Sequence, residues 1–370
     1  HIPYCKQACT YCNFHFRISQ KDKKEMLKCI KMELELRQSY LKNKTVKTIY
    51  FGGGTPSILN KIDIKSILDK IYKTFKIDKN AEITLECNPD DLTKKKLMAL
   101  KEVGINRLSI GVQSFEEKDL KFMNRSHNAN QSESCIKMAQ QVGFNNITID
   151  LIYGLPNQSL NAWKKNLNKM FALNIPHFSS YSLTIEEKTV LKHLVEQKKI
   201  TPLHEEKVNE QFSILMEMAK ENGFVHYEIS NFAKEGFYAK HNTAYWQNKY
   251  YLGVGPSAHS FNGGSRSWNV SSNKQYMLKI KKGEDYFESE ILNNPQQYNE
   301  YIFTALRTIW GVNSKTIKER FGKQMQAHFL KEVKKWETKK DIKRIENTYT
   351  LTTSGKFLAD AIASDLFIID

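Results

Sequence analysis

The sequence lacks any apolar run close to the roughly 20 residues that a helix needs to span a bilayer. It also lacks the apolar segment behind a basic amino-terminal stretch that marks a secretory signal, so nothing points to an oxidising compartment. These absences predict a cytoplasmic protein with reduced cysteines. A chain of 370 residues is long enough for one large core and a smaller satellite domain.

Arginine is scarce for a chain of such positive charge. Only eight of the 56 basic residues are arginine, although the formal net charge is +16. Proteins that read base edges favour clustered arginine, whereas the lysines here are spread along the chain among glutamate and asparagine. We therefore expect a solvated lysine surface and no nucleic-acid partner. The same charge would attract anionic lipid headgroups weakly, which leaves peripheral membrane association open.

Three of the six cysteines are concentrated near the start of the sequence. Cys5, Cys9 and Cys12 have the spacing C-x3-C-x2-C, which lets three thiolates converge on one inorganic cluster from a single loop. A cubane 4Fe-4S cluster held by three cysteines has one iron without a protein ligand, and that iron can bind a small molecule. The spacing therefore predicts a metal centre with an open coordination position.

Other uses of these cysteines are less consistent with the pattern. A disulfide would leave one of the three thiols unpaired, and structural zinc would need a fourth ligand, for which His15 is the candidate. Zinc motifs usually divide their ligands into two separated pairs, so we favour the cluster over a zinc-stabilised binding module. Cys29, Cys87 and Cys135 lie in apolar patterns and are predicted to be ordinary core residues.

Short runs rich in β-branched and aromatic residues alternate with amphipathic segments at helical spacing. The predicted strands are 46–51, 82–86, 107–113, 146–153, 177–183 and 224–229, and the predicted helices are 24–40, 92–103, 131–142 and 205–222. Repeated strand-helix units of this length imply a parallel sheet. The periodicity alone does not distinguish a barrel from a flat doubly wound sheet.

From about residue 276 the pattern changes. Helices are predicted at 296–309, 314–321 and 325–336, followed by a strand pair within 345–351 and a closing helix at 355–366. Three helices and a small hairpin resemble a winged helix, but no helix here is rich in arginine, which favours a lid or docking module over a DNA binder. We therefore expect one domain over residues 1–275 and a second over 276–370.

Several polar or glycine residues lie at the ends of the predicted strands. Glu86, Gln113 and Asp150 lie at or near the carboxyl ends of three of them, and Gly52 to Thr55 directly follow a fourth. In barrels of parallel strands the carboxyl ends carry the active site. We therefore expect these residues to face one mouth.

The cysteine loop, with Tyr11 immediately before the third cysteine, resembles the loop of the radical S-adenosylmethionine (SAM) family. Segments 1–5, 52–56, 86–89, 111–115 and 150–156 further resemble the HemN/HemW branch of that family. The resemblance covers nearly the whole chain. It implies an α/β fold, namely a partial (β/α)6 TIM-like barrel with a small winged-helix-like domain, and a first barrel strand with a SAM-contacting tyrosine before His1.

The resemblance also implies roles for individual residues. In the family the unligated iron chelates the amino and carboxylate groups of SAM, the glycine loop approaches the amino group, and the carboxylate at position 86 accepts hydrogen bonds from the ribose. A plain tight turn and a salt bridge to lysine are the alternative interpretations. The predicted cofactor-binding residues are Tyr11, Gly53, Gly54, Thr55, Glu86, Gln113, Arg125 and Asp150. For Gln113, Arg125 and Asp150, contact with a second SAM molecule is left open.

One departure from the oxidase side of the branch and two matching segments favour heme chaperones of the HemW type. Phe14 replaces a fourth cysteine, and segments 227–232 and 241–246 match chaperone motifs, the second being HNxxYW. The resemblance then implies heme binding and delivery to respiratory hemoproteins, with an external electron donor. The alternative is an oxygen-independent coproporphyrinogen III oxidase, a radical enzyme of porphyrin biosynthesis. Whether the protein cleaves SAM in its function and whether it forms a dimer are left open.

The HNxxYW segment offers a candidate heme ligand. The imidazole of His241 can bind heme iron, and Tyr245 and Trp246 present flat apolar faces for a macrocycle. The alternative is a structural histidine that hydrogen-bonds a loop. His259 is a second candidate. The glycines before it are expected to shape a turn and not to bind a dinucleotide, because the third glycine of a dinucleotide motif is missing.

Overall fold

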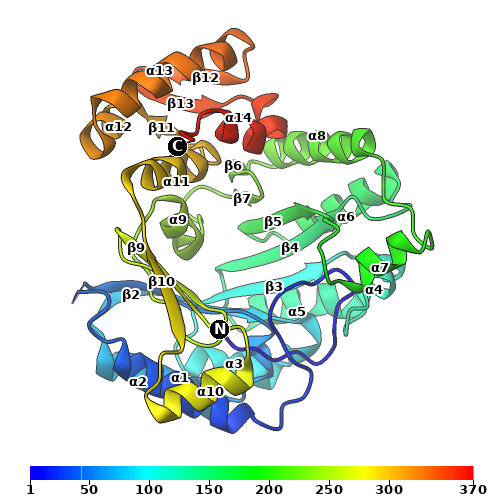
Figure 1. The fold of residues 1–370 in the computed structure, drawn as a ribbon. Coiled ribbons are helices and arrows are strands. Elements are labelled where there is room, and N and C mark those ends of the chain that lie inside the picture. The colour runs from blue at the N-terminus through cyan, green and yellow to red at the C-terminus, as the bar shows by residue number, and fades with distance from the viewer. Residues whose placement is uncertain (43, 370) are drawn as a thin grey trace.

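A seven-stranded sheet forms the centre of the larger unit in the computed structural model, which describes residues 1–42 and 44–369 (Figure 1). The strand order is β1 (Val46–Phe51), β2 (Ile77–Cys87), β3 (Arg107–Gln113), β4 (Ile147–Tyr153), β5 (His177–Ser182), β7 (Asn231–Ala233) and β6 (Val225–Glu228). Strands β1 to β5 are parallel, and β7 is antiparallel to both β5 and β6. Strand β6 therefore runs with β1 to β5. The sheet curls into part of a barrel, which confirms the predicted fold.

The sixth parallel strand does not pair with the fifth as a simple barrel would predict. The short strand β7 lies between them and continues the turn after β6. It was not predicted, because three residues are too few to show an alternating pattern.

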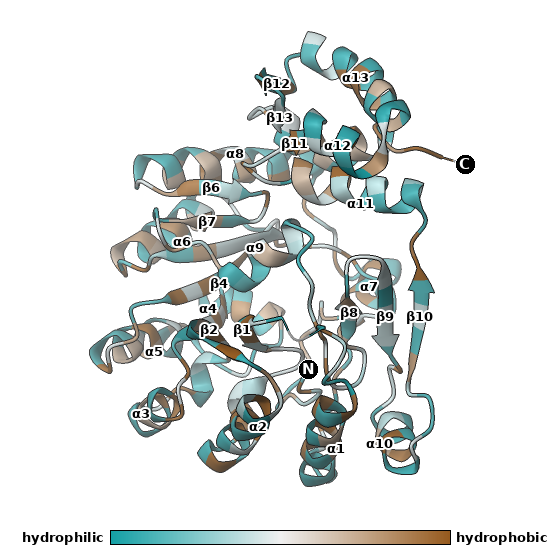
Figure 2. Cartoon of the chain, turned by 90° about the vertical axis from the view of Figure 1, so that its left-hand side faces the viewer, coloured by the Kyte–Doolittle hydropathy of each residue, from teal (hydrophilic) through white to brown (hydrophobic). Residues whose placement is uncertain are grey.

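Amphipathic helices connect the strands and cover the outer face of the sheet (Figure 2). The helices on this face are α1 (Lys23–Leu36), α2 (Lys61–Thr74), α3 (Lys94–Glu102), α5 (Ala129–Gln141), α6 (Leu160–Ala172) and α8 (Glu205–Glu221). The short helices α4 (Glu117–Phe122) and α7 (Val190–Glu196) lie instead beside the cysteine loop, and the 3-10 turns are η1 (Pro56–Ile58) and η2 (Pro89–Asp91). Capping boxes at Asn60 and Asn128 start α2 and α5 by satisfying free backbone amides. Within the described part of the chain, no helix has the length and apolarity that crossing a bilayer would require.

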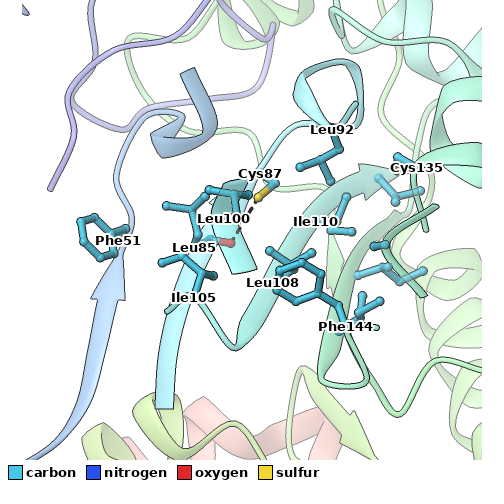
Figure 3. Packing of buried hydrophobic residues seen from close by; sticks show 14 of the residues in the cluster. Phe51, Leu85, Cys87, Leu92, Leu100, Ile105, Leu108, Ile110, Cys135 and Phe144 are labelled. Atoms are coloured by element: carbon cyan, nitrogen blue, oxygen red, sulfur yellow. Dashed lines mark hydrogen bonds between the residues drawn. The ribbon is translucent and has the colours of Figure 1, made fainter. Parts of the chain in front are cut away.

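The cysteines outside the first loop are core residues, as predicted. Cys29, Cys87 and Cys135 are each at most 4% exposed. Figure 3 shows Cys87 and Cys135 among aliphatic side chains, including Leu108 and Ile110 of β3. These thiols therefore belong to the packing of the sheet against its helices.

A second, antiparallel sheet was not predicted. It has the order β10 (Phe287–Ile291), β9 (Ser265–Asn269) and β8 (His259–Phe261), and it is accompanied by α9 (Lys240–Trp246) and α10 (Asn273–Lys282). Helix α10 packs on α1, and Tyr276, Ile280 and Tyr286 join the barrel core. This packing places residues 276–291 with the barrel, so the boundary that we propose moves from residue 276 to about residue 292.

The carboxyl-terminal unit has its own core, from Tyr298 to Leu366. It contains α11 (Asn294–Leu306), β11 (Val312–Asn313), α12 (Ser314–Phe321), α13 (Lys323–Thr338), β12 (Ile342–Ile345), β13 (Thr348–Leu351), η3 (Gly355–Leu358) and α14 (Ala359–Asp365). Three helices followed by an antiparallel hairpin confirm the winged-helix-like arrangement.

The two units meet at the β6 end of the barrel sheet, where the carboxyl-terminal elements lie at the top of Figure 1. The backbone amide of Ile229 donates to Arg307 O at 3.1 Å, and that of Ile309 donates to Tyr227 O at 3.0 Å. The Arg307 side chain also pairs with the buried Glu228, with Nε to Oε1 at 3.3 Å. The joint is thus made of backbone hydrogen bonds and a largely buried ion pair.

Candidate functional site

The cysteine loop lies across the carboxyl ends of the first barrel strands. Ile2 forms a parallel bridge with Gly53, directly after β1. Further along the loop, the Thr10 amide donates to Met123 O at 3.1 Å, and the Leu191 amide donates to Thr10 O at 2.9 Å. Both ends of the loop are therefore fixed by backbone hydrogen bonds to the barrel.

The three thiols are free and half-buried. Thr55 Oγ1 donates to Cys5 Sγ at 3.2 Å, and Arg125 Nη1 donates to Cys9 Sγ at 3.2 Å. Burial, together with the neighbouring Cys12 and Cys9, raises the pKa of Cys5 to about 11, while the hydrogen bond from Thr55 opposes the rise. Among the described residues, however, no three histidine, cysteine, aspartate or glutamate side chains lie close enough together to hold a metal ion.

The donor set nevertheless fits an iron-sulfur cluster. Three soft thiolate ligands from one loop are what such a cluster takes, and the guanidinium and hydroxyl donors would offset their negative charge. His15, the predicted fourth ligand of a zinc site, directs Nε2 to Asn273 Oδ1 at 2.7 Å. That nitrogen is therefore engaged with a residue of α10.

Arg125 connects the loop to two strand ends. Besides its contact with Cys9, Nη2 donates to Asn88 Oδ1 and to Gly111 O, both at 2.8 Å. Sequence reasoning named Arg125 as a pocket residue but did not predict its contact with a cysteine. That contact depends on the path of the linker after α4, for which the sequence gives no signal. Tyr11 lies in the same region, against the small hydrophobic cluster that includes Met123.

The glycine loop supports the start of the cysteine loop. Gly53 has φ of +112°, and a Cβ there would fall 1.8 Å from the His1 ring. The Gly54 amide donates to Ile2 O at 2.9 Å, and the Thr55 amide donates to Tyr4 O at 2.7 Å. The loop is thus more than a plain tight turn, because it needs glycine to admit the segment that carries the cysteines.

Glu86 is held at the end of β2 by two donors. Tyr50 OH donates to Oε1 at 2.7 Å, and the Gly53 amide donates to Oε2 at 3.2 Å. Burial raises the pKa of Glu86 to about 7. Among the described residues it forms no ion pair with lysine, unlike the alternative weighed above. Tyr50 was missed, although its place two residues before the glycines on a predicted strand could have indicated it.

The predicted strand-end residues do share one region. Asp150 lies close enough to Glu86 to raise the pKa of that carboxyl, and burial raises the pKa of Asp150 itself to about 6, while the charge of Arg125 opposes the rise. Gln113 adopts φ of +65° at a register shift between β3 and β4. A left-handed residue at a bulge redirects its side chain and is typical of functional sites.

His241 is fully engaged by neighbouring side chains. Its Nδ1 lies 2.8 Å from Thr48 Oγ1, its Nε2 lies 3.0 Å from Tyr245 OH, and its ring stacks on Tyr50 with centroids 4.6 Å apart. Burial lowers the pKa of His241 to about 4. This arrangement agrees with the structural alternative, and iron ligation by His241 stays a prediction that requires one of these hydrogen bonds to open.

A large cavity of about 1060 Å³ lies between the open edge of β1 and residues 240–259, and Gly53, Glu86 and His241 are among its walls.

Comparisons with known proteins agree with these observations. Residues 1–170 match the radical SAM superfamily, and residues 292–358 match the HemN C-terminal domain. Heme chaperone HemW of Bacillus subtilis is 36% identical over 98% of this chain and 96% of its own length. Heme chaperone HemW of Lactococcus lactis is 34% identical over 90% and 85%, respectively.

A solved structure has the same fold over almost the whole chain. Coproporphyrinogen III oxidase (HemN) from Escherichia coli superposes with a TM-score of 0.86, covering 99% of this chain and 88% of its own, at 22% identity. At this level of identity the likeness establishes the architecture and leaves the chemistry to the residues.

Proposed function

Because the chain belongs to the HemW family of radical SAM proteins, we propose that it is a heme chaperone that binds heme, a 4Fe-4S cluster and SAM. The observation that carries the proposal is the similarity to curated heme chaperones along nearly the full length of both chains. Membership of the radical SAM superfamily implies the cluster and SAM, whereas heme is the part of the proposal that needs direct measurement.

In this proposal Cys5, Cys9 and Cys12 hold the cluster, which when bound supplies an open iron for SAM. Arg125 and Thr55 already donate hydrogen bonds to two of the thiols, and they would stabilise the thiolate form. The residues around the loop therefore match the negative charge that a cluster brings.

The residues beside the loop are suited to an adenosyl ligand. Gly53 and Gly54 would contribute only backbone groups, since His1 and Tyr4 fill the space where their side chains would be, and Glu86 has lone pairs free to accept from ribose hydroxyls. Gln113, Arg125 and Asp150 would complete the pocket. The charge of Arg125 suits a carboxylate of the ligand.

Delivery completes the proposed function. We propose that the protein transfers heme to respiratory hemoproteins and that an external electron donor reduces the cluster. The proposal also includes peripheral association with anionic membranes. Self-association is left to measurement. The lysine-rich surface supports weak attraction to anionic lipid.

The second candidate is a coproporphyrinogen III oxidase, the activity named for the solved structure that shares this fold. Phe14, where the oxidase pattern has a fourth cysteine, is 70% exposed and contributes no metal ligand. The two candidates predict different products from the same anaerobic experiment.

In that experiment the protein is reconstituted with iron and sulfide, and its visible and electron paramagnetic resonance spectra are recorded with and without SAM. Heme or coproporphyrinogen III is then added. A chaperone should show a SAM-dependent cluster spectrum, a stable Soret band and heme transfer to an apo-hemoprotein, with little porphyrinogen turnover. Stoichiometric SAM consumption with protoporphyrinogen formation would establish the oxidase instead, and zinc alone in air-protected protein would reject both.

A further inference from the structure

The part of the cysteine loop between its first two cysteines is attached to the barrel at every residue. Gln7 Nε2 donates to Asn124 Oδ1 at 2.7 Å and to Asn124 O at 3.1 Å. Asn124 Nδ2 donates in return to Ala8 O at 2.7 Å. Asn124 has φ of +54°, a left-handed conformation that asparagine adopts more readily than most residues. Two of the three spacer residues are thus held by one side chain in the linker after α4.

Lys6 provides the third attachment, which is ionic. Its Nζ lies 2.8 Å from Asp90 Oδ2 and also pairs with Asp91 Oδ1. The two carboxylates belong to η2, and their side chains are only 12% and 6% exposed, whereas that of Lys6 is 42% exposed. Adjacent buried carboxylates repel each other unless a cation offsets their charge. Within residues 1–42 and 44–369, Lys6 is the one cation paired with either of them.

Hydroxyl groups orient the two carboxylates toward Lys6. Ser126 Oγ donates to Asp90 Oδ1 at 2.9 Å, and Ser57 Oγ donates to Asp91 Oδ2 at 2.5 Å. With the two contacts from Lys6, each of the four carboxylate oxygens has a donor. A fully satisfied buried network of this kind is rigid, so the acidic pair forms a preorganised anchor for the lysine.

The turn that anchors Lys6 is also connected to the second cysteine. Asn88, directly before η2, accepts from Arg125 Nη2 at 2.8 Å, and Arg125 Nη1 donates to Cys9 Sγ at 3.2 Å. Asn88 lies two residues after Glu86 on the same strand end. These contacts therefore fix the cysteine loop relative to the carboxylate that we expect to bind the ribose.

We propose that Lys6 is a positioning residue for the iron-sulfur cluster and that it acts through Asp90 and Asp91. The inference rests on the cluster of the proposed function and names residues that keep its loop in place. Because the spacer between Cys5 and Cys9 is already fixed, less conformational entropy is lost when the thiolates bind iron. The same contacts oppose the opening of the loop through which iron would leave.

The test measures how fast iron is lost. The full chain is reconstituted anaerobically with iron and sulfide, excess EDTA is added, and the decay of visible absorbance is followed for the wild type and Lys6→Met. Methionine keeps most of the side-chain length and removes the charge. We expect iron loss to be faster by about fivefold or more, because the buried carboxylates lose their cation and the loop opens more often. Lys121→Met, which removes only an exposed pair with Glu117 on α4, is the control and should match the wild type.

A neutral variant separates positioning from folding. Lys6→Met combined with Asp90→Asn and Asp91→Asn removes the repulsion between the carboxylates but leaves the loop without its ionic attachment. We expect its urea-unfolding midpoint to recover toward that of the wild type, while iron loss stays about fivefold faster. Iron retention that recovers together with the midpoint would show that Lys6 only offsets buried charge, and it would overturn the inference.

The single variant can also overturn the inference, since Lys6→Met protein that loses iron at the wild-type rate has no need of this attachment. Failure of the proposed function would look different. In that case the wild type itself would retain no iron-sulfur cluster after reconstitution, and this inference would fail with it.

Discussion

Glu33 Oε2 accepts a hydrogen bond from the Gly255 amide at 2.8 Å, although the two residues are 222 positions apart. The same carboxylate, which is fully buried, also accepts from Asn269 Nδ2 at 2.7 Å and from Tyr276 OH at 2.5 Å. One side chain on α1 therefore ties the loop before His259 to β9 and α10.

Replacing this carboxylate should destabilise the chain. Glu33→Ala leaves the buried Gly255 amide and Tyr276 hydroxyl without an acceptor, whereas Asn269 Nδ2 keeps its bond to Gly255 O. We expect the variant to lower the free energy of unfolding by about 2–4 kcal/mol, measured by urea denaturation. Glu25→Ala, on the same helix, removes only surface pairs with Lys28 and Lys281 and should leave the free energy of unfolding nearly unchanged. Equal losses in the two variants would argue against a special role for Glu33.

Removing the loop thiols should abolish iron binding and spare the fold. A triple Cys5→Ser, Cys9→Ser, Cys12→Ser variant is expected to retain almost no iron or sulfide after anaerobic reconstitution. Its helical circular dichroism should match the wild type, because the three thiols lie outside the main core. Cys135→Ala, in the core, is the matched control. It should lose about 1 kcal/mol of stability and keep the cluster. Iron retained by the triple variant would contradict the assignment.

Arg125 should influence the electronic properties of the cluster. Arg125→Lys keeps a positive charge but cannot maintain contacts with Cys9, Asn88 and the Gly111 carbonyl together. Hydrogen bonds to cluster sulfur favour the more negative, reduced state. We therefore expect a more negative midpoint potential in a redox titration monitored by electron paramagnetic resonance. An unchanged potential at full iron content would show that the contact is not made when the cluster is bound.

Two buried carboxyls should make stability depend on pH. Burial raises the pKa of Glu86 to about 7 and that of Asp150 to about 6, so the folded chain binds these protons more tightly than the unfolded chain does. Their stabilising effect is complete at low pH and is lost as pH rises toward 7. Glu86→Gln removes one such group, so its stability relative to the wild type should increase by about 1–3 kcal/mol between pH 5 and pH 8. The free energy of unfolding is measured by urea denaturation for both proteins at pH 5 and at pH 8. The same difference between variant and wild type at the two pH values would refute the prediction.

The sequence predicted the longer helices and strands well, because the spacing of apolar residues in a long segment shows whether it is a helix or a strand. The β3 and α12 ranges agree residue for residue with the predictions. Strand β7 and the β8–β9–β10 sheet were missed, since strands of three to five residues are formed by tertiary pairing more than by local pattern.

For the candidate site, the sequence predicted where the strand-end residues lie but not the side-chain contacts between distant segments. The rule that parallel strands end at one face brought Glu86 and Asp150 together correctly, because it depends only on strand direction. The contacts that Arg125 makes with Cys9, and that Tyr50 makes with His241, follow from loop paths and side-chain packing. Such contacts join distant segments and leave no local pattern in the chain.

The hydrogen bonds that Ile229 and Ile309 make between the two units also protect the edge of the barrel sheet. They occupy backbone groups at the outermost strand of the curled sheet, which would otherwise be available to recruit strands from other molecules. The carboxyl-terminal unit thus protects the barrel against aggregation, and heating should melt both units in one cooperative step.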